Sequence, residues 1–321
     1  MKNVLGIDLA KKKFDVALLI NGKYKSKVFE NNPSGLSSLL SWLAKNQIET
    51  VHACMEATGS YGEHLARFLH EAGHLVSVTN PAQIKAFGQS ELLRTKNDKT
   101  DAKLIARFCE KMEPTLWQPP SAEVEFLRGL GRRRDALVSM RTQELNRQET
   151  SNETVNSSVQ TVLECLDKEI EQISKLIKDH ISKHPGLKHK QELLSTIPGV
   201  GPSTIEAILS EINAFEGFET IEQVVAYMGL SPKEHTSGTS VRGKSAICKI
   251  GNSRLRKALY MPALSAIIHN PIVKALYDRM KAKSKNGMVI ACACMKKLVH
   301  LIYGVIKTNK PFDPAYTLKT A

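Results

Sequence analysis

A two-residue turn constrains the fold of this chain more than any other short segment. Asn21-Gly22 lies between two strand-like stretches, Phe14–Ile20 and Lys23–Glu30. Asn-Gly is the strongest short signal for a tight hairpin, because both turn residues must take up positive φ. Since the apolar run Val4–Leu9 comes just before, residues 4–30 are predicted to form three consecutive strands.

Helix and strand patterns alternate over the residues that follow. Helical spacing of apolar residues predicts helices at 34–45, 61–72 and 99–111, and short apolar runs predict strands at 50–57 and 74–78. The predicted order, β-β-β-α-β-α-β-α, is typical of a mixed α/β layer. We therefore expect a first domain over residues 1–113.

A proline-containing stretch at 114–120 marks the boundary to a helical sequence. Over Val155–Ile181, apolar residues recur at spacings of three and four, which predicts a long coiled-coil or amphipathic helical segment within 122–183. Its apolar stripe would pack either on its own domain or along an oligomer seam. Residues 186–321 are predicted to form a mostly helical third part, so the fold class is α/β plus all-α.

The charge balance indicates the class of partner. The chain carries 45 lysines and arginines against 32 aspartates and glutamates, a formal net charge of +13, which favours a polyanion, nucleic acid before membrane. No apolar run reaches the ~18 residues of a membrane span. The opening residues do not have the pattern of a signal peptide, so a cytoplasmic protein with no membrane partner is expected. The six cysteines form no CxxC pair, which argues against structural zinc or a disulfide scaffold.

Four carboxylates occupy positions that suit a metal site. Asp8 and Glu56 each lie near the end of a predicted strand amid apolar neighbours, and Asp98 and Asp101 start a predicted helix. Buried acids are costly unless they are paired or bind a cation, and ligand sets made only of oxygen suit Mg²⁺ or Mn²⁺. Taken singly, Asp98 is equally well explained as a helix cap and Asp101 as a first-turn acid.

The joint arrangement of these acids is more specific than any one of them. Asp8, a hairpin, Glu56 and then the Asp98/Asp101 pair follow the order of a ribonuclease-H-like fold with a RuvC-type acidic tetrad. Actin-like and sugar-kinase ATPases also open with a glycine, an aspartate and a hairpin. They need a second glycine-rich phosphate loop and a later adenosine motif, and the sequence contains neither.

A glycine-rich turn between two helical patterns predicts phosphate binding. The segment 195–212 is predicted to form a helix-hairpin-helix motif, with Gly199 and Gly201 in the turn. Exposed amides at the start of the second helix can bind a phosphate without reading base sequence. A plain helical turn is the alternative interpretation.

The segment 229–257 combines hydroxyls, glycines and cations with few apolar residues. A serine in such a loop can act as a nucleophile toward a phosphate, and cationic neighbours can bind the phosphate oxygens. The candidate phosphate-binding cations are Arg242, Lys244, Arg254 and Arg256. The candidate nucleophiles are Ser231, Ser237, Ser240, Ser245 and Ser253, and spacing alone does not choose among them.

Several long motifs in a fixed order carry a family resemblance. They include GIDLAKKKFDV (6–16), CMEATGSY (54–61), IPGVG (197–201), GLSPKEHTSGTSVRGKS (229–245) and YGVIKTNKPFD (303–313). The sequence resembles the transposases of bacterial insertion-sequence family 110, the bridge-RNA-guided recombinases. The resemblance implies a RuvC-like DEDD domain joined to a transposase domain with a catalytic serine. It assigns the tetrad to Asp8, Glu56, Asp98 and Asp101, and the nucleophile to Ser237.

The same resemblance implies a reaction and its partners. Donor and target DNA would be cut and rejoined through a covalent phosphoserine with Mg²⁺ assistance, guided by a noncoding bridge RNA. A homo-oligomer, a dimer or a tetramer on DNA, would assemble the site. The alternatives are a metal-dependent nuclease or Holliday-junction resolvase that hydrolyses DNA without needing Ser237, and a binding scaffold without activity.

Overall fold

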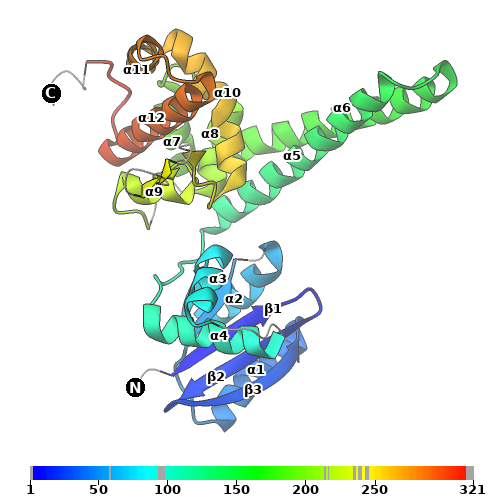
Figure 1. Ribbon diagram of the computed structural model, residues 1–321. Helices are drawn as coiled ribbons and strands as arrows, with labels where there is room; N and C mark the ends of the chain where they lie inside the picture. The colour runs from blue at the N-terminus through cyan, green and yellow to red at the C-terminus, as the bar shows by residue number, and fades with distance from the viewer. Residues whose placement is uncertain are drawn as a thin grey trace. The chain divides into compact units, whose positions relative to one another are not determined.

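The structure is a computed structural model that describes residues 3–57, 59–92, 98–212, 215, 217–233, 236–237, 241–242 and 246–315 (Figure 1). The chain divides into two compact units, Met1–Pro119 and Pro120–Ala321. The first unit is a mixed α/β layer, and the second consists mainly of helices.

A five-stranded mixed sheet forms the centre of the first unit. Its strand order is β3-β2-β1-β4-β5, in which β1, β2 and β3 pair antiparallel and β4 and β5 run parallel to β1. The turn between β2 and β3 has positive φ at Asn21 and Gly22, which confirms the predicted hairpin. The strands are β1 (Val4–Leu9), β2 (Lys13–Ile20), β3 (Lys23–Glu30), β4 (His52–Glu56) and β5 (Leu75–Thr79). This mixed sheet fits the predicted ribonuclease-H-like domain.

Helices cover both faces of this sheet. The helices α1 (Pro33–Lys45) and α2 (Glu63–Glu71) pack on one face, and α3 (Pro81–Ser90) and α4 (Asp98–Met112) pack on the other. A 3-10 turn, η1 (Gly59–Gly62), precedes α2. The sequence patterns did not predict α3, which lies between the predicted strand at 74–78 and the predicted helix at 99–111. In the structure, Asn80 caps this helix by accepting a hydrogen bond from the Ala82 amide, and Pro81 occupies its first turn.

Gly6 fixes how closely α4 approaches the sheet. A Cβ at Gly6 would overlap the carbonyl oxygen of Ala102 and the amide nitrogen of Ala106 in α4. Only glycine therefore allows this helix to lie directly on β1 (Figure 1). Because the contact lies two residues before Asp8, the first turn of α4 is held beside the end of β1.

The segment 122–183 is a pair of helices and not the single long helix predicted from its pattern. The helices α5 (Ala122–Gln148) and α6 (Glu153–Lys183) are joined by a short turn and lie side by side (Figure 1). Asn152 caps α6 by accepting a hydrogen bond from the Val155 amide, so the break needs neither glycine nor proline. Part of the predicted stripe, including Ile177 and Ile181, is buried in the core of its own unit.

The remaining helices build a single core around α12. Buried residues of this core come from every helix of the second unit, from Val124 in α5 to Val305 in α12. Between α9 and α10 the chain forms two short antiparallel ribbons, β6 with β9 and β7 with β8. The elements are α7 (Pro185–Ser195), α8 (Pro202–Glu211), α9 (Ile221–Tyr227), β6 (Pro232–Lys233), β7 (Thr236–Ser237), β8 (Val241–Arg242), β9 (Ala246–Ile247), α10 (Ser253–His269), α11 (Pro271–Ala282) and α12 (Gly287–Thr308).

The α12 helix corrects the expectation that no segment is long and apolar enough to span a membrane. Gly287–Thr308 meets that test by length and composition. Such a helix is weak evidence for a membrane, since core helices of soluble proteins pass the same test. Here Cys294, Leu298 and Ile302 of α12 are fully buried in the core of the helical unit.

Candidate active site

Strand pairing gathers carboxylates at the end of β1. Asp8 pairs with Asp15 of β2 across the antiparallel ladder, and Ile7 pairs with Met55 of β4, so Glu56 follows one step further along the parallel ladder. Because side chains alternate along a strand, these three acids share the sheet face on which α3 and α4 pack. The first turn of α4 adds Asp98 and Asp101 to the same region.

The pKa of Asp8 reflects both its burial and the charges of its acidic neighbours. Burial raises the pKa of Asp8, and the negative charges of Asp101, Asp98 and Asp15 raise it further, to about 6 from an ordinary value of 3.8. The structure therefore brings both α4 aspartates into electrostatic range of Asp8. Asp8 itself is partly buried, which strengthens these repulsions.

Two residues of this region were missed by sequence reasoning. Asp15 is only 9% exposed, although it carries a charge within an otherwise apolar strand. Lys13 donates a hydrogen bond from Nζ to Asp98 Oδ2 over 2.9 Å and lies 3.4 Å from Asp15 Oδ2. The hydrogen bond from Lys13 lowers the pKa of Asp98. The sequence signal that could have identified Asp15 is an acid within a predicted strand that pairs with β1.

The turn between α7 and α8 shows why its glycines are needed. Gly199 has φ +94°, and a Cβ there would lie 2.7 Å from the backbone of Ala266 in α10, so this position serves close packing. Gly201 caps α8 without a side chain and has open space around it. Both line a groove of about 1060 Å³, together with Ser203, Lys257 and other residues of α5, α8 and α10.

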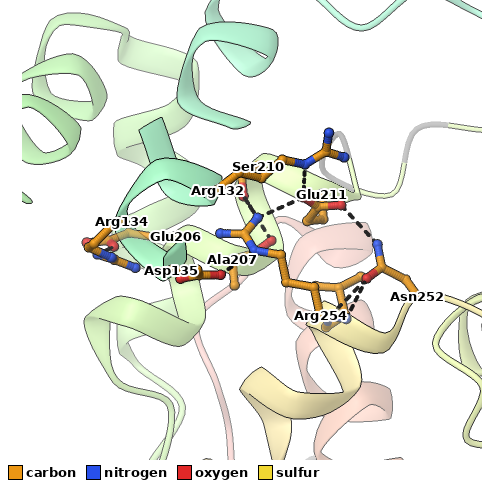
Figure 2. A network of polar contacts seen from close by, with 10 residues as sticks. Arg132, Arg134, Asp135, Glu206, Ala207, Ser210, Glu211, Asn252 and Arg254 are labelled. Atoms are coloured by element: carbon orange, nitrogen blue, oxygen red, sulfur yellow. Dashed lines mark hydrogen bonds and ion pairs between the residues drawn. The ribbon is translucent and has the colours of Figure 1, made fainter. Parts of the chain in front are cut away.

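Two of the arginines predicted to bind phosphate, Arg254 and Arg256, also make contacts inside the helical unit. Arg254 donates to Glu211 Oε1 over 2.7 Å and to Asp135 Oδ2 over 2.5 Å (Figure 2). Arg256 donates to the Met228 carbonyl oxygen over 3.1 Å. The physical reason for the first contact is Glu211, which is 8% exposed and needs a nearby cation.

Glu211 is the centre of the network in Figure 2, which joins α5, α8 and the start of α10. Burial alone would raise its pKa, but the hydrogen bond from Asn252 and the charges of Arg132 and Arg254 outweigh burial and lower the pKa of Glu211. Asn252 also caps α10. The network thus fixes the point where the chain enters α10.

The serine-bearing segment, residues 229–253, has its two ends close together. The Asn252 amide donates to the Tyr227 carbonyl oxygen over 2.6 Å, which brings the start of α10 to the end of α9. Between these points, Ser237 of β7 pairs with Val241 of β8, and Thr236 pairs with Arg242. Ser231 and Ser253 lie at the two ends of this segment. Lys244, Ser240 and Ser245 fall outside the described residues.

Comparison with known proteins identifies the family. Residues 5–150 match a transposase model for the DEDD domain of IS110, and residues 191–278 match the model described as "Transposase IS116/IS110/IS902 family". The pilin gene-inverting protein of Moraxella bovis is 35% identical over 315 residues, which cover 97% of this chain and 98% of that protein. The chain belongs to the IS110 family of transposases.

Other relatives of this IS110 transposase are more distant. The transposase for insertion sequence element IS1111A of Coxiella burnetii is 26% identical over 96% of this chain and 91% of that protein. A solved structure titled "T. thermophilus RuvC in complex with Holliday junction substrate" matches with a TM-score of 0.26 and 17% identity. That match covers 35% of this chain and 96% of that chain.

The two matched segments hold all five residues that the resemblance assigned. Asp8, Glu56, Asp98 and Asp101 lie within the first segment, and Ser237 lies within the second. DEDD domains of the RuvC-like type generally use divalent metal ions, and the oxygen-only donor set here suits such ions. Within the described part of the chain, however, no three His, Cys, Asp or Glu side chains lie close enough together to hold a metal ion.

The charge on Asp8 is expected to destabilise the metal-free fold at neutral pH. The folded-state pKa of about 6 exceeds the ordinary value of 3.8, so stability falls as pH rises through this window and the full loss is present above pH 6. Asp8→Asn should therefore stabilise the metal-free protein, by on the order of 2 kcal/mol at pH 7.5 after allowance for partial exposure. The gain should be clearly smaller at pH 4.5.

Denaturant unfolding in a chelating buffer at the two pH values measures this effect. Asp278→Asn, which changes an exposed aspartate of α11, is the control and should alter stability little at either pH. An equal gain for Asp8→Asn at both pH values would contradict the expected repulsion.

Proposed function

We propose that this IS110 transposase cuts and rejoins donor and target DNA through a covalent bond between DNA and Ser237. The observation that carries the metal-assisted part of the proposal is the placement of Asp8, Glu56 and the first-turn aspartates of α4 at one end of the sheet, where like charges repel unless a cation intervenes. When bound, Mg²⁺ or Mn²⁺ would supply Lewis-acid stabilisation of the charge that develops on the scissile phosphate. Asp8, Glu56, Asp98 and Asp101 would hold it.

The chain's own residues would carry out the bond exchange. The Ser237 oxygen attacks phosphorus, the bond from phosphorus to the leaving DNA oxygen breaks, and that oxygen takes up a proton. The serine proton passes to a carboxylate of the acidic cluster, which acts as the general base. Attack by a hydroxyl of the partner strand on the phosphoserine reverses these steps and rejoins the DNA.

A relative favours rejoining over hydrolysis. The pilin gene-inverting protein is named for inverting a gene, and inversion requires that cut strands be joined again. Hydrolysis by a metal-dependent nuclease or junction resolvase would leave free ends. The covalent route therefore suits this chain better than the hydrolytic alternative.

Nucleic-acid contacts are proposed for the glycine-rich turn before α8 and for two cations near Ser237 in the sequence. The open start of α8 at Gly201, beside Gly199, would bind a DNA or RNA phosphate, and the groove next to it also contains Lys257. Arg242, in the same ribbon as Ser237, and Lys244 would bind phosphates near the cut. The net charge of +13 supports an extended polyanion as partner.

A homo-oligomer is part of the proposal. The α5–α6 pair leaves several large apolar side chains 42–49% exposed, which favours a protein partner along these helices. They are Val138, Met140, Val155, Val162 and Leu176. In contrast, Ile173 packs against the core of its own unit, so charged substitutions there would test folding and not assembly.

We further propose that a noncoding bridge RNA guides the protein and that the reaction takes place in the cytoplasm. Base pairing would then select the DNA, while the protein contacts the backbone. Sequencing of the RNA that co-purifies with the protein is the direct test. One enriched RNA with segments complementary to both target and donor DNA is the expected result. Recovery of only random cellular RNA would refute guidance.

A further inference from the structure

A lysine occupies the space between the acids at the end of β1. Lys13 is the first residue of β2, and its ammonium group lies between Asp98 of α4 and Asp15 of β2, at 2.9 and 3.4 Å. Asp15 is almost fully buried. Lys13 therefore contacts two carboxylates from different elements of the site.

The backbone holds Lys13 in this position. The Ala10 amide donates to the Lys13 carbonyl oxygen over 2.9 Å, which closes the turn between β1 and β2. Asn31 supports the turn from the other side, because its amide donates to the Lys12 carbonyl oxygen and its side chain donates to that of Ala10. The base of the lysine side chain is thus fixed, while the side chain itself is 49% exposed to solvent.

The acids of the site differ in how their charge is balanced. The Lys13 Nζ atom lies 2.9 Å from Asp98 Oδ2 and 3.4 Å from Asp15 Oδ2, whereas the described residues show no ion pair between Lys13 and Asp8. The single positive charge of Lys13 therefore pairs with Asp98, while Asp8 stays beside negatively charged neighbours.

We propose that Lys13 is an internal counter-cation, which engages Asp98 in the metal-free protein and must be displaced before a divalent cation can bind the acidic cluster. The inference rests on the proposed metal-assisted function. An ammonium group suits this role because it is a compact, mobile charge on a flexible stem, and its exposure lets it move into water. A divalent cation brings twice the charge and can bind several carboxylates at once.

The consequence is that Lys13 weakens metal binding. Metal must replace an existing ion pair and approach a positive charge, so affinity for a divalent cation is lower than the four acids alone would give. An exposed ion pair changes an equilibrium constant by at most roughly fivefold. Removal of the lysine should therefore tighten metal binding by about fivefold.

The test uses Mn²⁺ as the probe and the full-length protein freed of nucleic acid. Titration calorimetry, with free Mn²⁺ counted by electron paramagnetic resonance, gives the dissociation constant without relying on activity. Lys13→Gln should bind Mn²⁺ about fivefold more tightly than the unaltered protein. Lys13→Arg keeps the charge and the hydrogen bonds, and should show no such gain.

Lys12→Gln is the matched control, because it removes one positive charge from the same turn at an exposed position that forms no ion pair with the described residues. It should change Mn²⁺ affinity less than twofold. Equal tightening in Lys12→Gln and Lys13→Gln would show a general charge effect and overturn the proposal. Weaker binding in Lys13→Gln would also overturn it, since Lys13 would then position Asp98 for the metal.

Asp8→Asn separates this proposal from the proposed function. If the unaltered protein and Asp8→Asn bind Mn²⁺ equally, or if neither binds it, the acidic cluster is not a metal site and both ideas fail. If Asp8→Asn loses binding while Lys13→Gln matches the unaltered protein, the metal site stands and only the role of Lys13 is refuted. Unfolding curves without metal confirm that each variant is folded.

Discussion

Ser237→Ala is expected to abolish both the covalent protein–DNA adduct and recombinant product, while RNA and DNA binding persist. Rejoining requires that the cut strand stay attached to the protein, and alanine offers no hydroxyl to form the phosphoserine. Loss of a nucleophile typically lowers a rate by four to six orders of magnitude, about 10⁴- to 10⁶-fold. The backbone pairing of Ser237 with Val241 should survive, because alanine fits the same strand position.

A denaturing gel with end-labelled target DNA measures this result. A band that migrates slowly and disappears on protease treatment is expected for the unaltered protein and absent for Ser237→Ala. Ser253→Ala, at the exposed first residue of α10, is the matched control and should retain the band. An adduct that persists in Ser237→Ala but is lost in Ser240→Ala or Ser245→Ala would move the nucleophile. Cleavage without an adduct in every variant would favour hydrolysis.

Asp8→Asn and Glu56→Gln are each expected to reduce DNA cleavage by at least about a thousandfold, the size of effect that corresponds to loss of metal-assisted charge stabilisation. Each change removes one negative charge from the end of neighbouring parallel strands but keeps the shape of the side chain. The fold and RNA binding should be retained, and Asp8→Asn should be more stable than the unaltered protein without metal. Single-turnover cleavage in Mg²⁺ measures the loss.

Glu49→Gln serves as the control for these two variants, because it changes an exposed acid that precedes β4, whereas Glu56 is the last residue of that strand. Its cleavage rate should match that of the unaltered protein. Full cleavage by both Asp8→Asn and Glu56→Gln would refute the assignment of these acids to a metal site.

The parts of the fold that depend on neighbouring residues could be predicted from the sequence. The Asn21-Gly22 hairpin was predictable because its signal lies within two residues, and the helix that starts at Asp98 because its apolar face repeats over several turns. The break between α5 and α6 was not, since a polar turn capped by Asn152 carries no glycine or proline. Local sequence signals therefore predict which helices and strands form more accurately than they predict where those elements end.

The parts of the site that depend on distant residues could not be predicted. Lys13 and Asp98 are 85 positions apart, and only the placement of α4 against Gly6 brings them together. The ion pair of Arg254 could not be predicted either, because Glu211, its buried partner, lies 43 positions earlier and no sequence pattern connects it to α10. The order of the acids along the chain indicated the kind of site, whereas their ion pairs needed the three-dimensional structure.

The closed base of the serine-bearing segment bears on how the chain can be altered. Because the Asn252 amide reaches back to Tyr227, the residues between them form a loop whose ends are already joined. For such a loop, each doubling of length adds only about 0.6 kcal/mol of closure entropy. The helical scaffold should therefore accept insertions or exchanged sequences there, which makes this loop the natural place to graft new strand-exchange chemistry.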